Sequence, residues 1–205
     1  MKPVYILNLV LIISVVVLCI KLAMTSNPVG NLSETVMKTI TTRTSIRKYQ
    51  DKPVEKEIIN QLLRAAMSAP SAMNKQPWHF VVVTKKEVLL SLALANPYAK
   101  MVAHAPLAIV ICGDMNKTIE GQGRDFWVQD ASATTENLLI AAHAFGLGAV
   151  WTGIFPLEER CEAVKQILHL PDHLIPLNTI VIGYPDENPK PKDKFNTENI
   201  SYDIY

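Results

Sequence analysis

The spacing of apolar residues predicts a domain in which helices and strands alternate. In residues 55–69 apolar side chains recur every three or four positions, which is typical of an amphipathic helix, and Pro70 ends this run. The β-branched and aromatic residues at 78–84 predict a buried strand after a short loop. The same two patterns continue along the chain, with helices expected at 86–95, 125–145 and 157–168, and strands at 108–112, 149–152 and 177–183. Gly146 or Gly148 is expected to cap the long helix.

The N-terminus is almost continuously apolar. Residues 4–20 contain only two polar side chains and are bracketed by Lys2 and Lys21. This length is just within the range that spans a membrane, so residues 1–23 are expected to form a transmembrane anchor or a signal segment. No small-x-small cleavage site follows, which favours an uncleaved anchor over export after cleavage.

The remaining chain has about the length of one ordinary domain. Residues 24–33 are small, polar and broken by Pro and Gly, which is typical of a linker. The folded domain is therefore expected at 34–205, beginning with a short helix that runs from Ser33 to about Thr41.

Charge and cysteine content exclude several classes of function. The formal net charge is +1, so no overall field suggests a nucleic-acid partner. Cys19, Cys112 and Cys161 form no close pair and imply neither a disulfide nor a zinc framework. Pro171 lies between His169 and His173 and argues against a metal-binding helix face, so no metal site is expected.

Two basic segments are candidates for an anion site. Arg43, Ser45 and Arg47 alternate, so an extended backbone would place two guanidinium groups and a hydroxyl on the same side, as a phosphate requires. A solvated basic loop is the alternative. Near the C-terminus, lysines also alternate, at residues 190, 192 and 194 in a Pro-rich stretch expected to be irregular. This tail is either solvated or lies across the domain, where it adds cations to the same phosphate.

The loop PSAMNKQP at residues 70–77 carries several hydrogen-bonding groups between two prolines. Those prolines restrict the loop and hold its donors in a semi-rigid arc in front of the strand at 78–84. The loop is either part of a site for a hydrogen-bonding ligand or an ordinary polar connection.

Taken together, these segments resemble the nitroreductase family of flavoproteins. The resemblance rests on RTSIRKY at 43–49, a helix, APSAMNKQPWHFVVV at 69–83, GLGAVWTG at 146–153 and GYPDENPKPK at 183–192, in the order and spacing of the family. It covers about Ser33 to Lys194. It implies an α+β fold with a central mixed or antiparallel sheet flanked by helices, and a homodimer with two active sites at its interface.

The resemblance also implies roles for individual residues. Four match the segment that binds the phosphate and ribityl chain of FMN: Arg43, Thr44, Ser45 and Arg47. Four match the loop that reaches the flavin from the partner subunit: Pro70, Ser71, Ala72 and Asn74. Three match the backbone near the reactive N5 edge of the flavin ring: Trp151, Thr152 and Gly153. Two match the basic pair that closes on the phosphate: Lys192 and Lys194.

The implied activity is an FMN-dependent oxidoreductase. NADH or NADPH would reduce the flavin, and a nitro compound, quinone or similar small acceptor would then bind in the same pocket. Because flavin N5 carries the chemistry, no catalytic side chain is expected. Thr152 stands where some relatives carry Glu, and Phe126 and Trp127 are candidates for the acceptor pocket, although core packing is their other role.

Two further expectations follow from this activity. Dependence on cellular NAD(P)H makes the cytoplasmic side the expected location of the domain. The alternative function is a flavin-binding protein without turnover, such as a membrane-held electron relay.

Overall fold

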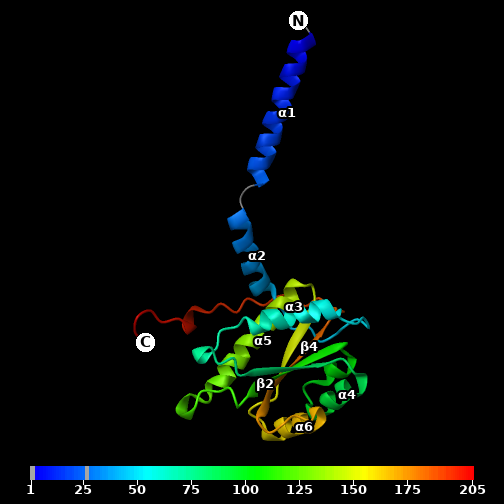
Figure 1. Cartoon of the computed structure of the whole chain (residues 1–205), viewed down its shortest axis with the longest axis vertical. Helices are drawn as coiled ribbons and strands as arrows, with labels where there is room; N and C mark the ends of the chain where they lie inside the picture. The colour runs from blue at the N-terminus through cyan, green and yellow to red at the C-terminus, as the bar shows by residue number, and fades with distance from the viewer. Residues whose placement is uncertain (1–2, 26–27) are drawn as a thin grey trace. The chain divides into compact units, whose positions relative to one another are not determined.

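We describe a computed structural model of this protein, which covers residues 3–25 and 28–205 (Figure 1). The chain divides into two units, Met1–Ile40 and Thr41–Tyr205. The first unit contains α1 (Pro3–Thr25) and most of α2 (Pro28–Thr42). The helix expected from Ser33 is therefore present but begins earlier, so that the second half of the predicted linker is helical.

The predicted membrane anchor is not supported. Within the part of the chain that the structure describes, no helix is both long and apolar enough to cross a membrane.

Four antiparallel strands form the centre of the second unit. They are β1 (Trp78–Val83), β2 (Leu107–Asp114), β3 (Gly148–Gly153) and β4 (Leu174–Gly183), in the order β1-β2-β4-β3. The register between β2 and β4 shifts at one irregularity, between Ile111 and Cys112. Each predicted strand is present, and the sheet is antiparallel rather than mixed.

Helices cover both faces of this sheet. One face packs against α3 (Lys56–Met67) and α5 (Phe126–Ala144), and the other against α4 (Lys86–Ala95) and α6 (Glu158–Leu168) (Figure 1). Short 3-10 helices lie in the connections, at Ala72–Asn74 (η1), Lys100–His104 (η2), Gly121–Gly123 (η3) and Thr197–Asn199 (η4). The predicted α+β architecture is confirmed, while the homodimer stays a prediction.

Strand β2 shows how the sequence produces two cores. Its alternate residues 107, 109 and 111 belong to the cluster under α3 and α5, whereas 108, 110 and 112 belong to the cluster under α4 and α6. A strand buried on both faces reads as a continuous apolar run, which explains the sequence LAIVIC. Burial also raises the pKa of the Cys112 thiol to about 12, so this cysteine is a packing residue.

Gly146, not Gly148, caps the long helix α5. Its φ is +73°, and its N–H donates to His143 O at 3.0 Å while the N–H of Leu147 donates to Ala142 O at 2.8 Å. This pair of bonds is the Schellman pattern that terminates many helices. Gly148 instead begins β3, where a Cβ would stand 2.6 Å from the Cβ of Ile46.

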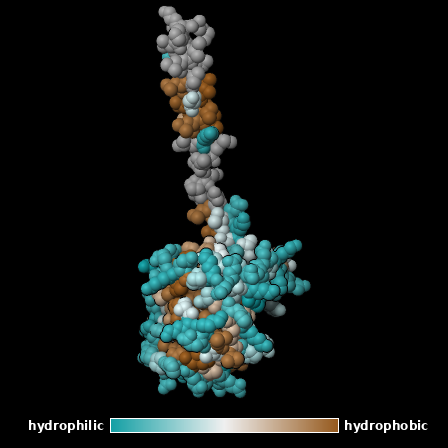
Figure 2. Space-filling model, turned by 90° about the vertical axis from the view of Figure 1, so that its right-hand side faces the viewer, coloured by the Kyte–Doolittle hydropathy of each residue, from teal (hydrophilic) through white to brown (hydrophobic). Residues whose placement is uncertain are grey.

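On the face shown in Figure 2, hydrophilic residues surround the edge of the second unit and hydrophobic residues lie among polar ones in its middle. The exposed hydrophobic side chains on α4 are Leu90 and Leu94.

Candidate flavin site

The segment at residues 43–50, called the arginine segment below, lies along the outer edge of β3. Ser45 forms a parallel bridge with Ala149, and the N–H of Ile46 donates to Ala149 O at 3.0 Å. Ile46 is buried against Gly148, which holds the chain against the sheet at this point. Arg47, the next residue, therefore lies near Trp151.

Arg47 lines a cleft of about 200 Å³ together with the predicted ring-edge segment. The cleft is formed by the end of β3, the turn after α4 and the first turns of α6, and its lining residues are Arg47, Asn96, Tyr98, Met101, Val150, Trp151, Thr152, Gly153 and Arg160. The structure thus brings Arg47 together with Trp151, Thr152 and Gly153, while their roles toward FMN stay predictions.

Hydrogen bonds organise this cleft around Gly153. Asn96 Nδ2 donates to Gly153 O at 3.2 Å, and Arg160 Nη1 lies 3.4 Å from the same oxygen. The guanidinium of Arg160 lies 5.4 Å from the centre of the Tyr98 ring, within cation–π range. The lining contains two arginines and no carboxylate, so its electrostatic potential favours an anionic or electron-rich group.

Thr152 contributes its backbone, not its hydroxyl. Its side chain is buried, and Oγ1 donates to Thr179 O at 2.8 Å inside the sheet. Gly153 has open space where a side chain would begin, and Trp151 is 37% exposed. The surface offered to a ligand is therefore the main chain at residues 152–153 with the indole beside it.

Arg43 occupies a different environment from Arg47. Its Nε lies 3.4 Å from Glu136 Oε1 of α5, and its side chain is 19% exposed. Nearby on α5, burial and the charge of Arg43 lower the pKa of His143, whose Nε2 is 2.9 Å from Thr42 Oγ1. The described contacts do not bring the two guanidinium groups to one point, so the predicted phosphate trio stays a prediction. The hydroxyl of Thr44 donates a hydrogen bond to Thr42 O.

The loop before β1 is held from α5 and has an unusual backbone. The N–H of Ala72 donates to Asp130 Oδ1 at 2.9 Å, and the N–H of Gln76 donates to Ser71 Oγ at 3.0 Å. Met73, Asn74 and Gln76 all have φ near +50°, a left-handed conformation that costs of order 1 kcal/mol or more for a residue other than glycine. Such concentrated strain is typical of functional loops.

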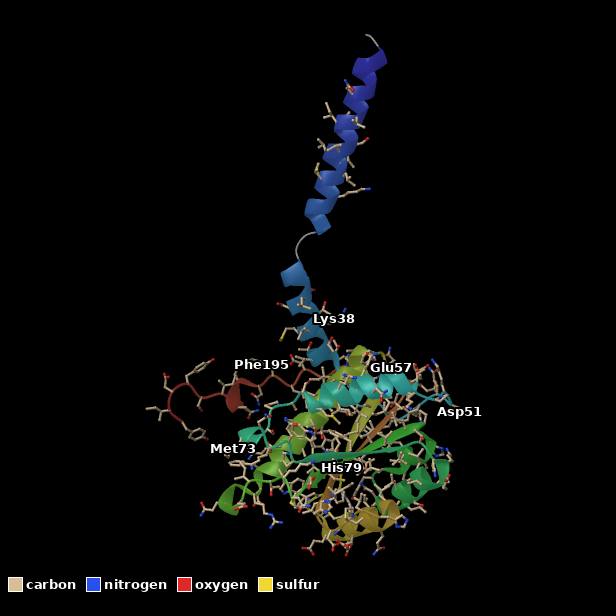
Figure 3. The ribbon with its side chains drawn as sticks, viewed as in Figure 1. Lys38, Asp51, Glu57, Met73, His79 and Phe195 are labelled. Atoms are coloured by element: carbon tan, nitrogen blue, oxygen red, sulfur yellow. The ribbon has the colours of Figure 1, made fainter. Side chains whose placement is uncertain are left out.

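This loop borders a second cleft and not the Arg47 cleft. The second cleft has a volume of about 600 Å³ and is lined by Leu63, Met67, Asn74, Lys75, Gln76, Trp78, His79, Phe80 and Lys117. Figure 3 shows Met73 at the outer end of the loop, where its side chain is 78% exposed. Pro70 is exposed as well. Within one chain, the loop and the ring-edge segment therefore face different clefts.

The C-terminal lysines lie on an irregular, exposed tail. Lys192 and Lys194 are fully on the surface, and Phe195 beside them is 76% exposed and projects from the tail (Figure 3). The start of the tail is tied to the arginine segment: Tyr49 bridges Pro185, the N–H of Gln50 donates to Tyr184 O, and Glu187 Oε1 accepts from the N–H of Arg47. The contact of the lysines with a phosphate stays a prediction.

Comparison with known proteins identifies the family. The Nitroreductase family matches residues 40–100 and 88–184 of this chain. The chain belongs to the nitroreductase family. The predicted resemblance is confirmed.

One relative is similar in sequence, and two solved structures are similar in both sequence and fold. A protein of Methanothermobacter thermautotrophicus that carries the provisional name NADH dehydrogenase/NAD(P)H nitroreductase is 48% identical over 80% of this chain and 85% of its own length. A crystal structure from Parabacteroides distasonis with the same provisional name is 44% identical, with a TM-score of 0.79 over 83% of this chain and 99% of that one. A provisionally named nitroreductase from Desulfovibrio desulfuricans, solved in complex with FMN, is 30% identical, with a TM-score of 0.70 over 83% of this chain and 97% of that one.

The two aromatic residues at the start of α5 in this nitroreductase-family chain differ in setting. Trp127 is buried, and its ring lies 4.9 Å from Phe155 in an edge-on arrangement and close to Gly113. Phe126 is 45% exposed. Core packing therefore accounts for Trp127, while a role of Phe126 beside an acceptor stays a prediction.

Sequence reasoning missed several residues of the cleft, namely Asn96, Tyr98, Met101 and Arg160. The only local signal is the Asn-Pro step that ends α4. Arg160 lies in a charged surface helix and has no motif of its own. Among the described residues, no group of three or more His, Cys, Asp or Glu could hold a metal ion.

Proposed function

We propose that this protein is an FMN-dependent oxidoreductase that uses NADH or NADPH to reduce nitro compounds, quinones or similar small acceptors. The observation that carries the proposal is the cleft in which Arg47 meets the backbone of residues 152–153. Family membership supports it, as does the FMN in the Desulfovibrio desulfuricans relative. The NAD(P)H requirement is supported by the provisional name of the Methanothermobacter relative.

The residues of the cleft fit one end of FMN. Gly153 leaves room for a flat ring to approach the main chain, and the partly exposed indole of Trp151 lies beside it. The volume of about 200 Å³ is smaller than the roughly 300–1,000 Å³ of typical ligand pockets. One chain therefore offers only part of a site, which supports a homodimer in which the partner's loop supplies the missing wall.

FMN, when bound, supplies the redox chemistry. The chain's own residues bind and orient. Arg47 and Arg160 add positive potential that favours negative charge on the bound group. Arg43, Ser45, Lys192 and Lys194 are proposed to hold the phosphate, and Ser71, Ala72 and Asn74 to reach the cofactor bound by the partner. The cytoplasmic location rests on the NAD(P)H requirement alone and stays a prediction.

The first experiment is an absorbance spectrum of the purified full chain. It should show bound flavin, and the flavin absorbance should bleach when NADH or NADPH is added without oxygen. A colourless protein that also binds no added FMN would refute the proposal. Stopped-flow reduction separates the enzyme from a flavin carrier, because a carrier would be reduced slowly by either nicotinamide.

A variant at Gly153 tests whether this cleft is the site. A Cβ at Gly153 would meet no atom within 4 Å, so Gly153→Val should place its side chain in the space that the proposed ring needs. We expect loss of FMN with an unchanged melting temperature of the apoprotein, whereas the matched Gly153→Ala variant should retain most of the binding. Full FMN binding by Gly153→Val would place the cofactor elsewhere.

A further inference from the structure

We propose that Glu187 is a positioning residue that fixes the backbone of Arg47 and thereby directs this arginine into the cleft. The inference rests on the proposed function, because the ligand that Arg47 meets there is taken to be FMN. Glu187 itself does not line the cleft.

The carboxylate of Glu187 accepts two consecutive backbone N–H groups. Its Oε1 accepts from the N–H of Arg47 and, at 3.1 Å, from the N–H of Lys48. The donors and the acceptor lie 139–140 residues apart in the chain, so the bonds join the arginine segment to the start of the C-terminal tail. Hydrogen bonds to a charged acceptor are roughly twice as strong as neutral ones.

The other backbone groups around Arg47 are also held. The N–H of Ile46 donates to Ala149 O, and the single hydroxyl hydrogen of Tyr49 has two acceptors within reach, Ile46 O and, at 3.2 Å, Val181 O. Burial raises the pKa of Tyr49 well above its usual range, so its hydroxyl remains a donor. The N–H of Asp186 donates to Lys48 O at 2.9 Å. Without Glu187, the N–H groups of residues 47 and 48 would lose their acceptor.

A carboxylate at this place is electrostatically unfavourable for binding a phosphate. Its negative charge lies against the segment whose arginines are proposed to attract an anionic cofactor, and like charges repel. The hydrogen bonds to the main chain explain why an acidic residue is present. Positioning of Arg47 therefore has to outweigh the repulsion, and this balance can be measured.

Three variants of the full-length protein separate the two effects. Glu187→Gln keeps an oxygen that can accept both N–H groups but removes the charge, whereas Glu187→Ala removes both. Asp186→Ala is the matched control, because it removes a charge from the neighbouring position and the carboxylate of Asp186 forms no ion pair or hydrogen bond among the described residues. Affinity is measured by titrating each apoprotein with FMN and following flavin fluorescence.

We expect Glu187→Ala to weaken FMN binding by about tenfold, the usual scale for loss of a charge-assisted hydrogen bond. Glu187→Gln should stay within about threefold of the wild type, because a neutral acceptor remains and the repulsion is gone. Asp186→Ala should bind FMN like the wild type. Binding by Glu187→Ala that equals or exceeds the wild type would overturn the proposal, as would equal losses in the Ala and Gln variants.

Amide hydrogen exchange of the apoprotein provides a readout that needs no cofactor. Exchange at the backbone of residues 47 and 48 should accelerate in Glu187→Ala but not in Glu187→Gln or Asp186→Ala. If the wild type binds no FMN, the proposed function fails while this exchange still tests the positioning. Unchanged exchange in Glu187→Ala would show that Glu187 does not hold the segment.

Discussion

Replacing Arg47 by alanine should weaken the binding of FMN and of riboflavin by similar factors, whereas replacing Arg43 should weaken FMN alone. Arg47 shares its cleft with residues 151–153, which are proposed to lie at the flavin ring. FMN and riboflavin have the same ring, so a contact made there is lost for both. Arg43 lies beside Glu136 and outside that cleft, which leaves it the phosphate as a possible ligand group.

The structure sets the size of each effect. A hydrogen bond to a charged group contributes about 1.5–3 kcal/mol, which corresponds to roughly a tenfold to hundredfold change in Kd. Arg47 is exposed, so we expect the lower end, about tenfold, for both ligands. Arg43 would have to exchange Glu136 for the phosphate, so its loss should also cost about tenfold, for FMN only.

Fluorescence titration of the apoproteins with FMN and riboflavin measures both constants. The control is Glu136→Gln, which releases Arg43 from its ion pair and should tighten FMN binding while leaving riboflavin unchanged. If Arg47→Ala lowers FMN affinity but spares riboflavin, Arg47 holds the phosphate, and our reasoning from its position in the cleft is refuted.

Three further variants test other parts of the domain. Asp130→Ala removes the acceptor for the N–H of Ala72 and should lower the free energy of unfolding, measured by urea denaturation, by about 1.5–3 kcal/mol. Asp130→Asn keeps an oxygen, so an equally large loss in that variant would argue against the hydrogen bond. Gly148→Ala places a methyl group against Ile46 and should destabilise the protein by about 1–3 kcal/mol, so an unchanged melting temperature would contradict this packing. Burial and Arg43 lower the pKa of His143 below its usual 6.5, so the unfolded state binds more protons, and this contribution to stability is present above pH 6.5 and is lost as the pH falls below it. In His143→Gln, the free energy of unfolding should therefore change less with pH below pH 6.5. An identical dependence on pH would show that His143 is not responsible.

The secondary structure was accessible to sequence reasoning because each element carries a local pattern. The run LAIVIC at 107–112 is apolar throughout since β2 is buried on both faces, and helix α3 shows its amphipathic spacing directly. The choice between Gly146 and Gly148 could not be made, because it depends on Ile46, which packs on Gly148 from about 100 residues away.

Only part of the site could be predicted from the sequence, because the site also depends on contacts between distant residues. Motifs drew attention to Arg47 and to residues 151–153, which line one cleft, but the other residues of that cleft come from other elements. Asn96 and Arg160 both contact Gly153 O, and no local pattern in the sequence predicts that shared contact. Alternation predicted that Arg43 and Arg47 share one side, yet Glu136 holds Arg43 beside α5. The apolar N-terminal run predicted an anchor that the described residues do not support.

Met73, Asn74 and Gln76 have a left-handed backbone, so substitutions that raise the thermal stability of this loop are expected to lower its proposed binding of the cofactor. Glycine adopts that conformation without the steric cost, so a selection for thermostability alone should accept glycine there. At Asn74, that change would also delete a side chain that is proposed to reach the partner's cofactor. Stabilised variants of this protein should therefore be screened for flavin retention before their melting temperatures are compared.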